Sequence, residues 1–332
     1  MNIGIAGNGK IVAEMLSVVK NISSINIAAI CVRPQSEEKG RAIAKAHSIP
    51  KVYTVYPQML SDDTIDFIYV AVPNRQHYAY AKQALEAGKN VICEKPFTVN
   101  AAETEELITL AKTKHLFLFE AITILYAPNF IYLKEILSSP DHRLNIGALR
   151  YVHANYAQYS SRYDRYLHQD VAPAFDPHAA GGALYDLNVY NLHFIIGLFG
   201  EPKDITYRAN FGFNGIDTSG TALLNYDSFT AVCSAAKDSD GISGITFQGE
   251  RGTIELLGAP NICGLLRVSQ KNKIPLLTSH KTPGHRMIDE FTAFAKLFKD
   301  KDYDTCYANL SHSLRVMQAL EKARLSSGLS FD

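Results

Sequence analysis

The stretch Val91–Pro96, VICEKP, decides how this 332-residue chain is interpreted. It begins with apolar residues typical of a buried strand and ends with the charged pair Glu94 and Lys95, followed by Pro96. In an open parallel sheet, the carboxyl ends of the strands face the ligand crevice. A lysine at such an end is well placed for chemistry and poorly placed for a core. We therefore expect Lys95 to lie beside a bound ligand.

The first 120 residues alternate short apolar runs with helical patterns. This rhythm of strand, helix and strand predicts right-handed crossovers and a doubly wound parallel sheet. Gly88 directly follows one of the helical patterns, where a C′ glycine belongs. The expected strands are Asn2–Ala6, Ile27–Val32, Phe67–Val72, Asn90–Cys93 and Leu116–Phe119, and the expected helices include Lys10–Val19, Glu37–Ala46, Gln76–Ala87 and Ala101–Thr113.

The pattern changes after about Glu120, so we predict domains over residues 1–120 and 121–332. A helix is expected over Ile124–Leu137, and two amphipathic helices are expected near His285–Phe298 and Tyr307–Ser326. Alternating runs between them predict a largely antiparallel sheet with one face open to helices or a second subunit. Those runs are Ala148–Gln158, Ile205–Phe213, Thr218–Tyr226, Thr230–Ala235, Ile245–Gln248 and Thr253–Leu257.

Composition excludes several classes of protein. Hydrophobic residues make up 47% of the chain, charged residues 20%, and the formal net charge is zero. No basic tail or charge run indicates binding to nucleic acid or to an anionic membrane. No apolar run approaches the roughly 20 residues that span a bilayer, and the N-terminus does not resemble a signal peptide. The five cysteines lack metal-site spacing, so we expect no metal and a reducing cytoplasm.

Glycines follow the first expected strand and open the first expected helix. They let the backbone turn tightly and approach a pyrophosphate, which would lie at the positive end of the helix. A dinucleotide would then contact the consecutive residues Gly7, Asn8, Gly9, Lys10 and Ile11. A third small residue is expected where Val12 stands, so a plain strand-to-helix turn remains the alternative.

Two further segments flank the same predicted crevice. Arg33 follows the second strand, where an acidic residue would bind the ribose of NAD. An arginine there can pair with a 2′-phosphate and favours NADP over NAD, or it is an ordinary surface residue. The run Val72, Pro73 and Asn74, with His77 shortly after it, could bind ribose or phosphate. Asn74 could instead cap the following helix.

The segment Ala183–Phe199 is predicted to be a helix. Asp186, Tyr190 and His193 are spaced at i, i+4 and i+7, so they would share one face, opposite an apolar face. A carboxylate, a phenol and an imidazole on one stripe suit a catalytic site. The alternative is a helix whose polar groups are buried and satisfied.

Together the glycine turn, the Val72–His77 segment and the run Ala87–Pro96 resemble the glucose-fructose oxidoreductase, inositol dehydrogenase and MocA family. The run Gly181–Asp186 resembles the signature of that family's second domain. The resemblance implies a Rossmann domain that binds NAD or NADP, followed by an α+β domain with a large, mostly antiparallel open sheet. It also implies hydride transfer at a hydroxyl or carbonyl of a sugar, polyol or trans-diol.

Within this family the chain looks most similar to the dimeric dihydrodiol and xylose dehydrogenases. The tyrosine four residues after Asp186 and the run Phe119–Ala121 carry that similarity. Inositol dehydrogenases have histidine in place of Tyr190, which argues against an inositol substrate.

The resemblance also implies roles for the site residues. Lys95 would bind the reacting oxygen, and a cation there stabilises developing alkoxide charge. Tyr190 would exchange the proton, with Lys95 as the nearby cation that a phenol of pKa about 10 requires. Asp186 would orient Lys95 or bind a substrate hydroxyl. Glu94 would turn away from substrate or contact the nicotinamide ribose, and His193 would bind substrate or pack the helix.

Other inferences remain open at this stage. Arg162 and Tyr163 open a basic, aromatic loop that could close over substrate or remain solvated. A cis bond between Lys95 and Pro96 is conceivable. We expect a homodimer or homotetramer formed through the C-terminal sheet. The competing functions are a catalytically silent regulator that binds NAD(P) and an enzyme that cleaves glycosides with NAD.

Overall fold

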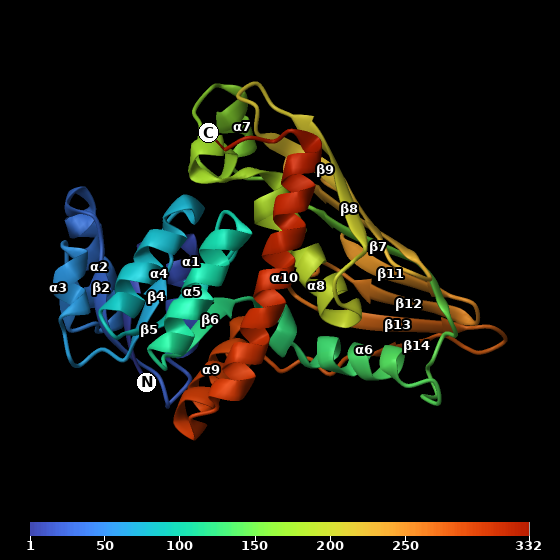
Figure 1. Cartoon of the computed structure of the whole chain (residues 1–332), viewed down its shortest axis with the longest axis horizontal. Coiled ribbons are helices and arrows are strands. Elements are labelled where there is room, and N and C mark those ends of the chain that lie inside the picture. Colours follow the sequence, from blue (N-terminus) through green and yellow to red (C-terminus); the bar gives the residue numbers. More distant parts are fainter. Residues whose placement is uncertain (332) are drawn as a thin grey trace. The chain divides into compact units, whose positions relative to one another are not determined.

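The computed structural model describes residues 1–331, and the chain divides into two compact units. The first unit contains residues 1–121 and 287–314, and the second contains residues 122–286 and the rest of the chain from 315 (Figure 1). The chain therefore leaves the first unit after Ala121 and later returns to it. The sequence-based division at residue 120 did not include this return.

The first unit is built on a six-stranded parallel sheet with the order β3-β2-β1-β4-β5-β6. This order confirms the doubly wound fold, because the direction of winding reverses between β1 and β4. The strands are β1 (Asn2–Ala6), β2 (Asn26–Cys31), β3 (Lys51–Tyr53), β4 (Phe67–Val70), β5 (Asn90–Glu94) and β6 (Leu118–Ala121). The helices are α1 (Lys10–Val19), α2 (Glu37–His47), α3 (Tyr56–Leu60), α4 (His77–Glu86), α5 (Ala101–Thr113) and α9 (Met287–Asp300).

The central strands are buried on both faces, as expected for a parallel sheet covered by helices. Every residue of β4 is buried, and so are the last four residues of β1 and β5. The five expected strands and four expected helices lie within about two residues of their predicted bounds. Strand β3 was missed, because its three residues are only half-buried at the edge of the sheet and carry no apolar run.

Helix α9 completes one face of the sheet with aromatic side chains. Phe294 stacks on Phe119 with ring centroids 4.5 Å apart, and Phe298 meets Phe67 edge-on at 5.0 Å. Phe291 meets a further strand residue, Tyr69, at 5.9 Å. Such pairs contribute about 0.5–1.5 kcal/mol each beyond the area they bury. The returning segment is therefore part of the core of the first unit.

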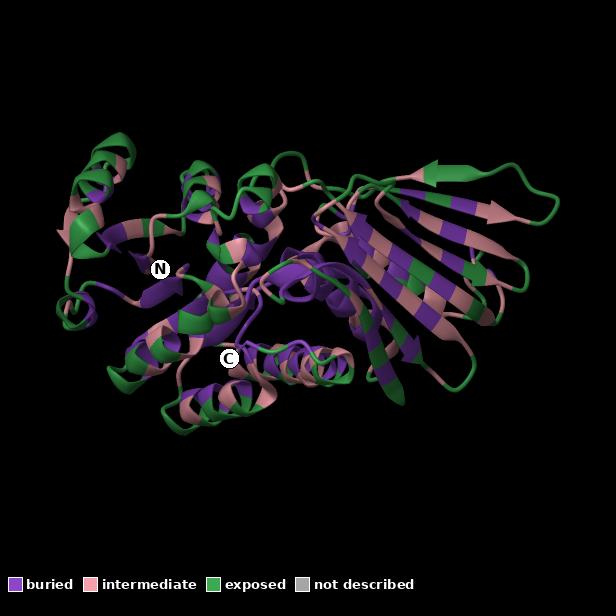
Figure 2. Ribbon diagram, turned by 90° about the horizontal axis from the view of Figure 1, so that it is seen from above, coloured by how far each residue is buried: buried purple, intermediate pink, exposed green. Residues whose placement is uncertain are grey.

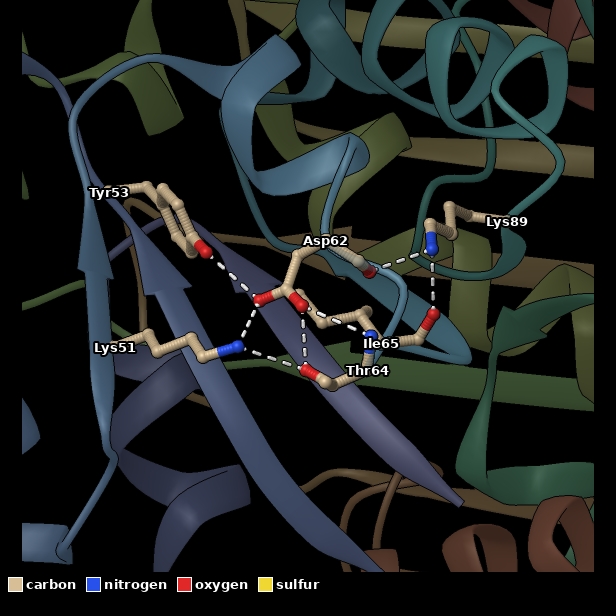
Figure 3. Close-up of polar contacts among 6 residues, drawn as sticks. All are labelled: Lys51, Tyr53, Asp62, Thr64, Ile65 and Lys89. Carbon is tan, nitrogen blue, oxygen red and sulfur yellow. Dashed lines mark hydrogen bonds and ion pairs between the residues drawn. The ribbon is translucent and has the colours of Figure 1, made fainter.

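A polar cluster ties the edge strand β3 to the segment before β4 (Figure 3). The Asp62 carboxylate accepts hydrogen bonds from Lys51 Nζ at 2.7 Å and from Tyr53 Oη at 2.9 Å. The hydrogen bond from Lys51, followed by that from Thr64, holds the pKa of Asp62 well below its usual range. Lys89 also holds the segment before β4, because its Nζ donates a hydrogen bond to the carbonyl oxygen of Asp62 at 2.8 Å.

The second unit is built on an eight-stranded sheet with the order β14-β13-β12-β11-β7-β10-β9-β8. All neighbours are antiparallel except β7 and β10. Burial alternates along β10, as expected for a sheet with one covered face (Figure 2). The strands are β7 (Leu149–Ala157), β8 (Asp204–Phe211), β9 (Asp217–Asn225), β10 (Thr230–Ala236), β11 (Gly244–Gly249), β12 (Gly252–Leu257), β13 (Leu265–Gln270) and β14 (Leu276–Thr278).

The helices that begin in the second unit are α6 (Pro128–Ser138), α7 (Tyr163–Leu167) and α8 (Val189–Phe199). A π-helical turn, Leu184–Asn188, precedes α8, and the long helix α10 (Tyr303–Ser327) begins in the first unit and ends in the second. All residues from Val189 to Ile196 are buried. Over these residues the predicted polar stripe and the predicted apolar face are both buried, as in the stated alternative of a helix with polar groups in the core. Within residues 1–331, no helix combines the length and apolar character needed to span a bilayer.

Candidate active site

The first glycine of the turn after β1 is required by the fold. Gly7 has a φ of +128°, and a Cβ atom there would lie 2.3 Å from the carbonyl oxygen of Ala71. Its amide donates to the carbonyl of Cys31 at 3.0 Å, which joins the turn to the end of β2. The turn thus lies where β1 and β4 wind in opposite directions, the position at which doubly wound folds bind ligands.

The start of α1 fits a dinucleotide pyrophosphate. Gly9 is the N-cap, no side chain caps the helix, and its first turn carries no acidic residue. A Cβ atom on Gly9 would meet nothing within 4 Å, so the backbone is open to a ligand. Asn8, Lys10 and Ile11 are half-buried or exposed around this turn. Uncapped amides and the helix dipole together favour a phosphate.

Arg33 is exposed two residues after β2 and is the N-cap of the short turn Pro34–Ser36. Burial raises the pKa of the Tyr80 phenol, and the charge of Arg33 opposes that rise, so the guanidinium lies near this ring. An exposed guanidinium at this position is accessible to a 2′-phosphate.

His77 is not placed as a ligand of ribose or phosphate. The side chain is only 1% exposed. Its Nδ1 lies 2.8 Å from the carbonyl oxygen of Pro96, and its Nε2 lies 3.0 Å from that of Val72. Burial lowers the pKa of the ring, and the two carbonyl contacts oppose that effect. We therefore correct the expected contact: His77 joins the segments that follow β4 and β5, and both its nitrogens are occupied.

Val72, Pro73 and Asn74, the other predicted contacts in the segment before His77, differ in burial and in local structure. Val72 is half-buried and Pro73 is exposed at the end of β4. Asn74 opens a short 3-10 turn, and α4 begins at His77 with Gln76 as its N-cap, so Asn74 is not the cap of that helix.

The two charged residues at the end of β5 differ in burial. Glu94 is 6% exposed and accepts a hydrogen bond from the phenol of Tyr69 on β4. Lys95 is half-buried, and its bond to Pro96 is cis. Glu94 is thus held by a neighbouring strand.

In the second unit, the predicted site residue Asp186 has a partner that the sequence did not reveal. Its Oδ2 lies 2.9 Å from Nζ of Lys237, whose side chain is 3% exposed while that of Asp186 is 33% exposed. Lys237 looks like a surface residue in the sequence, because it opens the polar run Lys237–Asp240. A partly exposed carboxylate is therefore anchored by a buried cation.

A buried carboxylate, Asp217, lies against the glycine pair Gly181 and Gly182, which precedes the π-helical turn that carries Asp186. Oδ2 of Asp217 accepts hydrogen bonds from the amide of Leu184 at 2.6 Å and the phenol of Tyr207 at 2.8 Å. A Cβ atom on Gly182 would lie 1.9 Å from Oδ1 of Asp217. Burial raises the pKa of Asp217 to about 7, and the two hydrogen bonds oppose that rise. The glycine is thus required by a close approach to a carboxylate.

The remaining predicted residues lie in aromatic surroundings or in the core. Tyr190 is 6% exposed, with its ring centroid 5.8 Å from that of Tyr156, and His193 is fully buried. Exposed Arg162 precedes α7, where Tyr163 packs against Phe175 with centroids 5.7 Å apart. Residues 1–331 hold no group of three His, Cys, Asp or Glu side chains suited to a metal ion.

Comparisons with known proteins agree with this geometry. Residues 1–121 match the model of an oxidoreductase family with an NAD-binding Rossmann fold, and residues 142–255 match the C-terminal domain of the same GFO/IDH/MocA family. The chain is 32% identical to the NADP(+)-dependent scyllo-inositol 2-dehydrogenase IolU of Bacillus subtilis, over 98% of this chain and 97% of that protein.

One further relative and one solved structure extend the comparison. Trans-1,2-dihydrobenzene-1,2-diol dehydrogenase of Macaca fascicularis is 31% identical over 76% of this chain and 73% of its own. A 3-ketoreductase of Actinomadura kijaniata, solved with NADP and TDP-benzene, has the same fold, with a TM-score of 0.85, 20% identity and 98% of each chain covered. The chain therefore belongs to the GFO/IDH/MocA family of NAD(P)-dependent oxidoreductases.

Proposed function

We propose that this protein is an NADP-dependent dehydrogenase that oxidises a CH–OH group of a cyclic polyol or trans-diol, or reduces the matching carbonyl. The uncapped start of α1 carries the proposal, since it suits a pyrophosphate. The exposed Arg33 favours the 2′-phosphate of NADP. The relatives named for scyllo-inositol and for a trans-diol act on vicinal hydroxyls of a six-membered ring, which supports the substrate class.

An inositol is retained among the candidate substrates. The tyrosine at position 190 argued against inositols at the sequence level. That argument loses its weight, because a protein named as an inositol dehydrogenase matches this chain over nearly its whole length.

The nicotinamide, when bound, exchanges the hydride with the substrate carbon. We propose that Lys95 binds the reacting oxygen, where an ammonium stabilises developing negative charge. Tyr190 is proposed as the group that takes or returns the hydroxyl proton. Asp186 is proposed to bind a neighbouring hydroxyl through its exposed side, which suits a substrate with vicinal hydroxyls.

Turnover on a substrate panel tests this proposal. Purified protein is incubated with NADP⁺ or NAD⁺ and with inositols, aldoses and trans-diols, and absorbance at the wavelength of reduced nicotinamide is followed. We expect a rate with at least one cyclic vicinal diol and NADP⁺. Lys95→Ala should abolish this rate while NADPH still binds, as judged by nucleotide fluorescence. Unchanged turnover in Lys95→Ala would remove that lysine from the mechanism.

The same experiment separates the competing functions. A silent regulator would bind NADPH and turn over no member of the panel. A glycoside-cleaving enzyme would keep its cofactor bound and hydrolyse an aryl glycoside without net reduction. The presence of Lys95, Asp186 and Tyr190 in one chain favours the dehydrogenase.

We also propose that the protein forms a homodimer or homotetramer through the eight-stranded sheet, in a reducing cytoplasm. One face of that sheet carries the alternate, more accessible residues of its strands. The five cysteines are free and buried, which suits a reducing compartment. Light scattering during gel filtration measures the subunit number, and a monomer at micromolar concentration would contradict this part of the proposal.

A further inference from the structure

Lys237 occupies an unusual position for a lysine. It directly follows β10 and begins a polar run, yet its side chain is 3% exposed. Its backbone is held on both sides, because its amide donates to Thr218 at 2.8 Å and its carbonyl accepts from Ser160 at 2.9 Å. The side chain therefore starts from a fixed point and extends into the core of the second unit.

Three groups enclose the ammonium. It forms a salt bridge with Oδ2 of Asp186 at 2.9 Å and donates a hydrogen bond to the carbonyl of Ala174. The ring of Phe175 lies beneath it, with the centroid 4.5 Å from Nζ. An enclosed cation is costly unless charges and dipoles compensate it. One carboxylate, one carbonyl and one aromatic face contribute to this compensation.

The pair is asymmetric in exposure. The ammonium is enclosed, whereas the Asp186 side chain is one-third exposed. A pair that served only to fill the core could be replaced by apolar side chains at little cost. Here the buried partner instead fixes one oxygen of a carboxylate that remains accessible.

A second carboxyl group, Asp217 on β9, also feels the charge of Lys237. Its Oδ2 is already held by Leu184 and Tyr207, and its Oδ1 has no hydrogen-bond partner among residues 1–331. Lys237 therefore acts electrostatically on two acidic groups and forms its salt bridge with the accessible one.

We propose that Lys237 is a positioning residue for the dehydrogenase reaction: its ammonium holds one oxygen of Asp186 so that the exposed side of the carboxylate receives a substrate hydroxyl. This inference rests on the proposed function. Lys237 acts on substrate through Asp186, with which it forms its salt bridge, and does not bind substrate itself. Loss of its charge should therefore affect substrate handling and leave the nucleotide site in the first unit unchanged.

Lys237→Met tests the inference, because methionine fills similar space without charge. We expect kcat/KM to fall about tenfold or more, mainly through KM, while the Kd for NADPH is unchanged. The acid limb of the pH profile of kcat/KM should move to higher pH, because a carboxylate without its cation ionises less readily. Lys237→Gln, which keeps a hydrogen-bond donor, serves as the second variant where the methionine form does not fold.

A double-mutant cycle with Asp186→Asn distinguishes positioning from general stability. In the Asp186→Asn background, Lys237→Met should cost little further in kcat/KM, because its route to the substrate through Asp186 has been removed. Lys89→Met is the matched control, since Lys89 is a buried lysine that binds backbone carbonyls in the first unit. It should lower the melting temperature without moving the acid limb.

Two results would contradict the inference. If the folded Lys237 variants keep the wild-type KM and pH profile and lose only thermal stability, Lys237 is a structural residue. The same holds if the costs of the two substitutions in the cycle simply add. Wild-type protein that turns over no substrate at all would instead remove the proposed function, so the two failures can be told apart.

Discussion

At the scale of single residues, we propose that the exposed cation Arg33 selects the nucleotide. Arg33→Ala should weaken NADPH about tenfold and NADH less than twofold, because only NADPH carries the 2′-phosphate that a guanidinium pairs with. Titration of protein fluorescence with each nucleotide measures both constants. Equal losses for the two nucleotides would mean that Arg33 does not read the phosphate.

Asp217 makes stability depend on pH. Its pKa is raised from 3.8 to about 7 in the folded protein, so the folded chain holds a proton that the unfolded chain releases. Stability should therefore fall as pH rises from about 4 to 7 and level off above that, by about 1.4 kcal/mol per pH unit at most.

Asp217→Asn should flatten this dependence. Urea unfolding at pH 5 and pH 7.5 gives the difference between the two proteins. The lowered pKa of His77 makes stability rise with pH, which is opposite in sign to the effect of Asp217. This contribution is the same in both proteins, so the difference between them reports on Asp217 alone. Parallel curves for wild type and variant would show that Asp217 is ionised throughout.

At the scale of elements, the turn before the π-helical segment depends on a glycine for two reasons. Gly182 has a φ of +95°, and a Cβ atom there would lie 1.9 Å from Asp217. Gly88 also has a positive φ, but a Cβ atom there would meet nothing within 4 Å. Gly88→Ala should cost about 1–2 kcal/mol for its left-handed backbone alone. Gly182→Ala should cost clearly more in urea unfolding, and equal costs would refute the role of the close approach.

The elements also show what a sequence can predict. The strands of the first sheet could be located because a covered parallel strand is a short apolar run, as in Phe67–Val70. Strands β13 and β14 were missed. In β14, two exposed leucines carry no alternation. Burial does alternate along β13, but its exposed Leu265 interrupts the alternation of residue types. Local pattern weakens where exposed positions carry apolar side chains.

The candidate site was predictable only in part. Gly7, Lys95 and Asp186 each lie in a short motif of neighbouring residues that can be recognised in the sequence. Lys237 follows Asp186 by some fifty residues and sits in a polar run that is typical of a surface loop. The helical stripe that united Asp186, Tyr190 and His193 assumed regular α-helix, whereas a π-helical turn precedes α8 and shifts the angular positions. Buried charge pairs across distant strands leave no periodic signal.

At the scale of the whole molecule, the first unit is assembled from two distant segments. A fragment of residues 1–121 lacks the aromatic residues of α9 that cover Phe67 and Phe119. We expect this fragment to show no cooperative thermal transition by circular dichroism. A fusion of residues 1–121 to 287–314 through a flexible linker should recover the transition and bind NADPH. A fragment 1–121 that melts cooperatively at the temperature of the fusion would show that α9 is dispensable.

The order in which the chain emerges from the ribosome gives α9 a further significance. Residues 122–286 are synthesised after the strands of the first sheet and before α9, the helix that covers one face of that sheet. Translation proceeds at about 5–20 residues per second, so the aromatic face of β4 and β6 remains uncovered for roughly 10–30 s until α9 has been synthesised. During that interval the nascent protein presents Phe67, Phe117 and Phe119 to its surroundings. Chaperone demand during translation should therefore concentrate on this face, long before the second unit is complete.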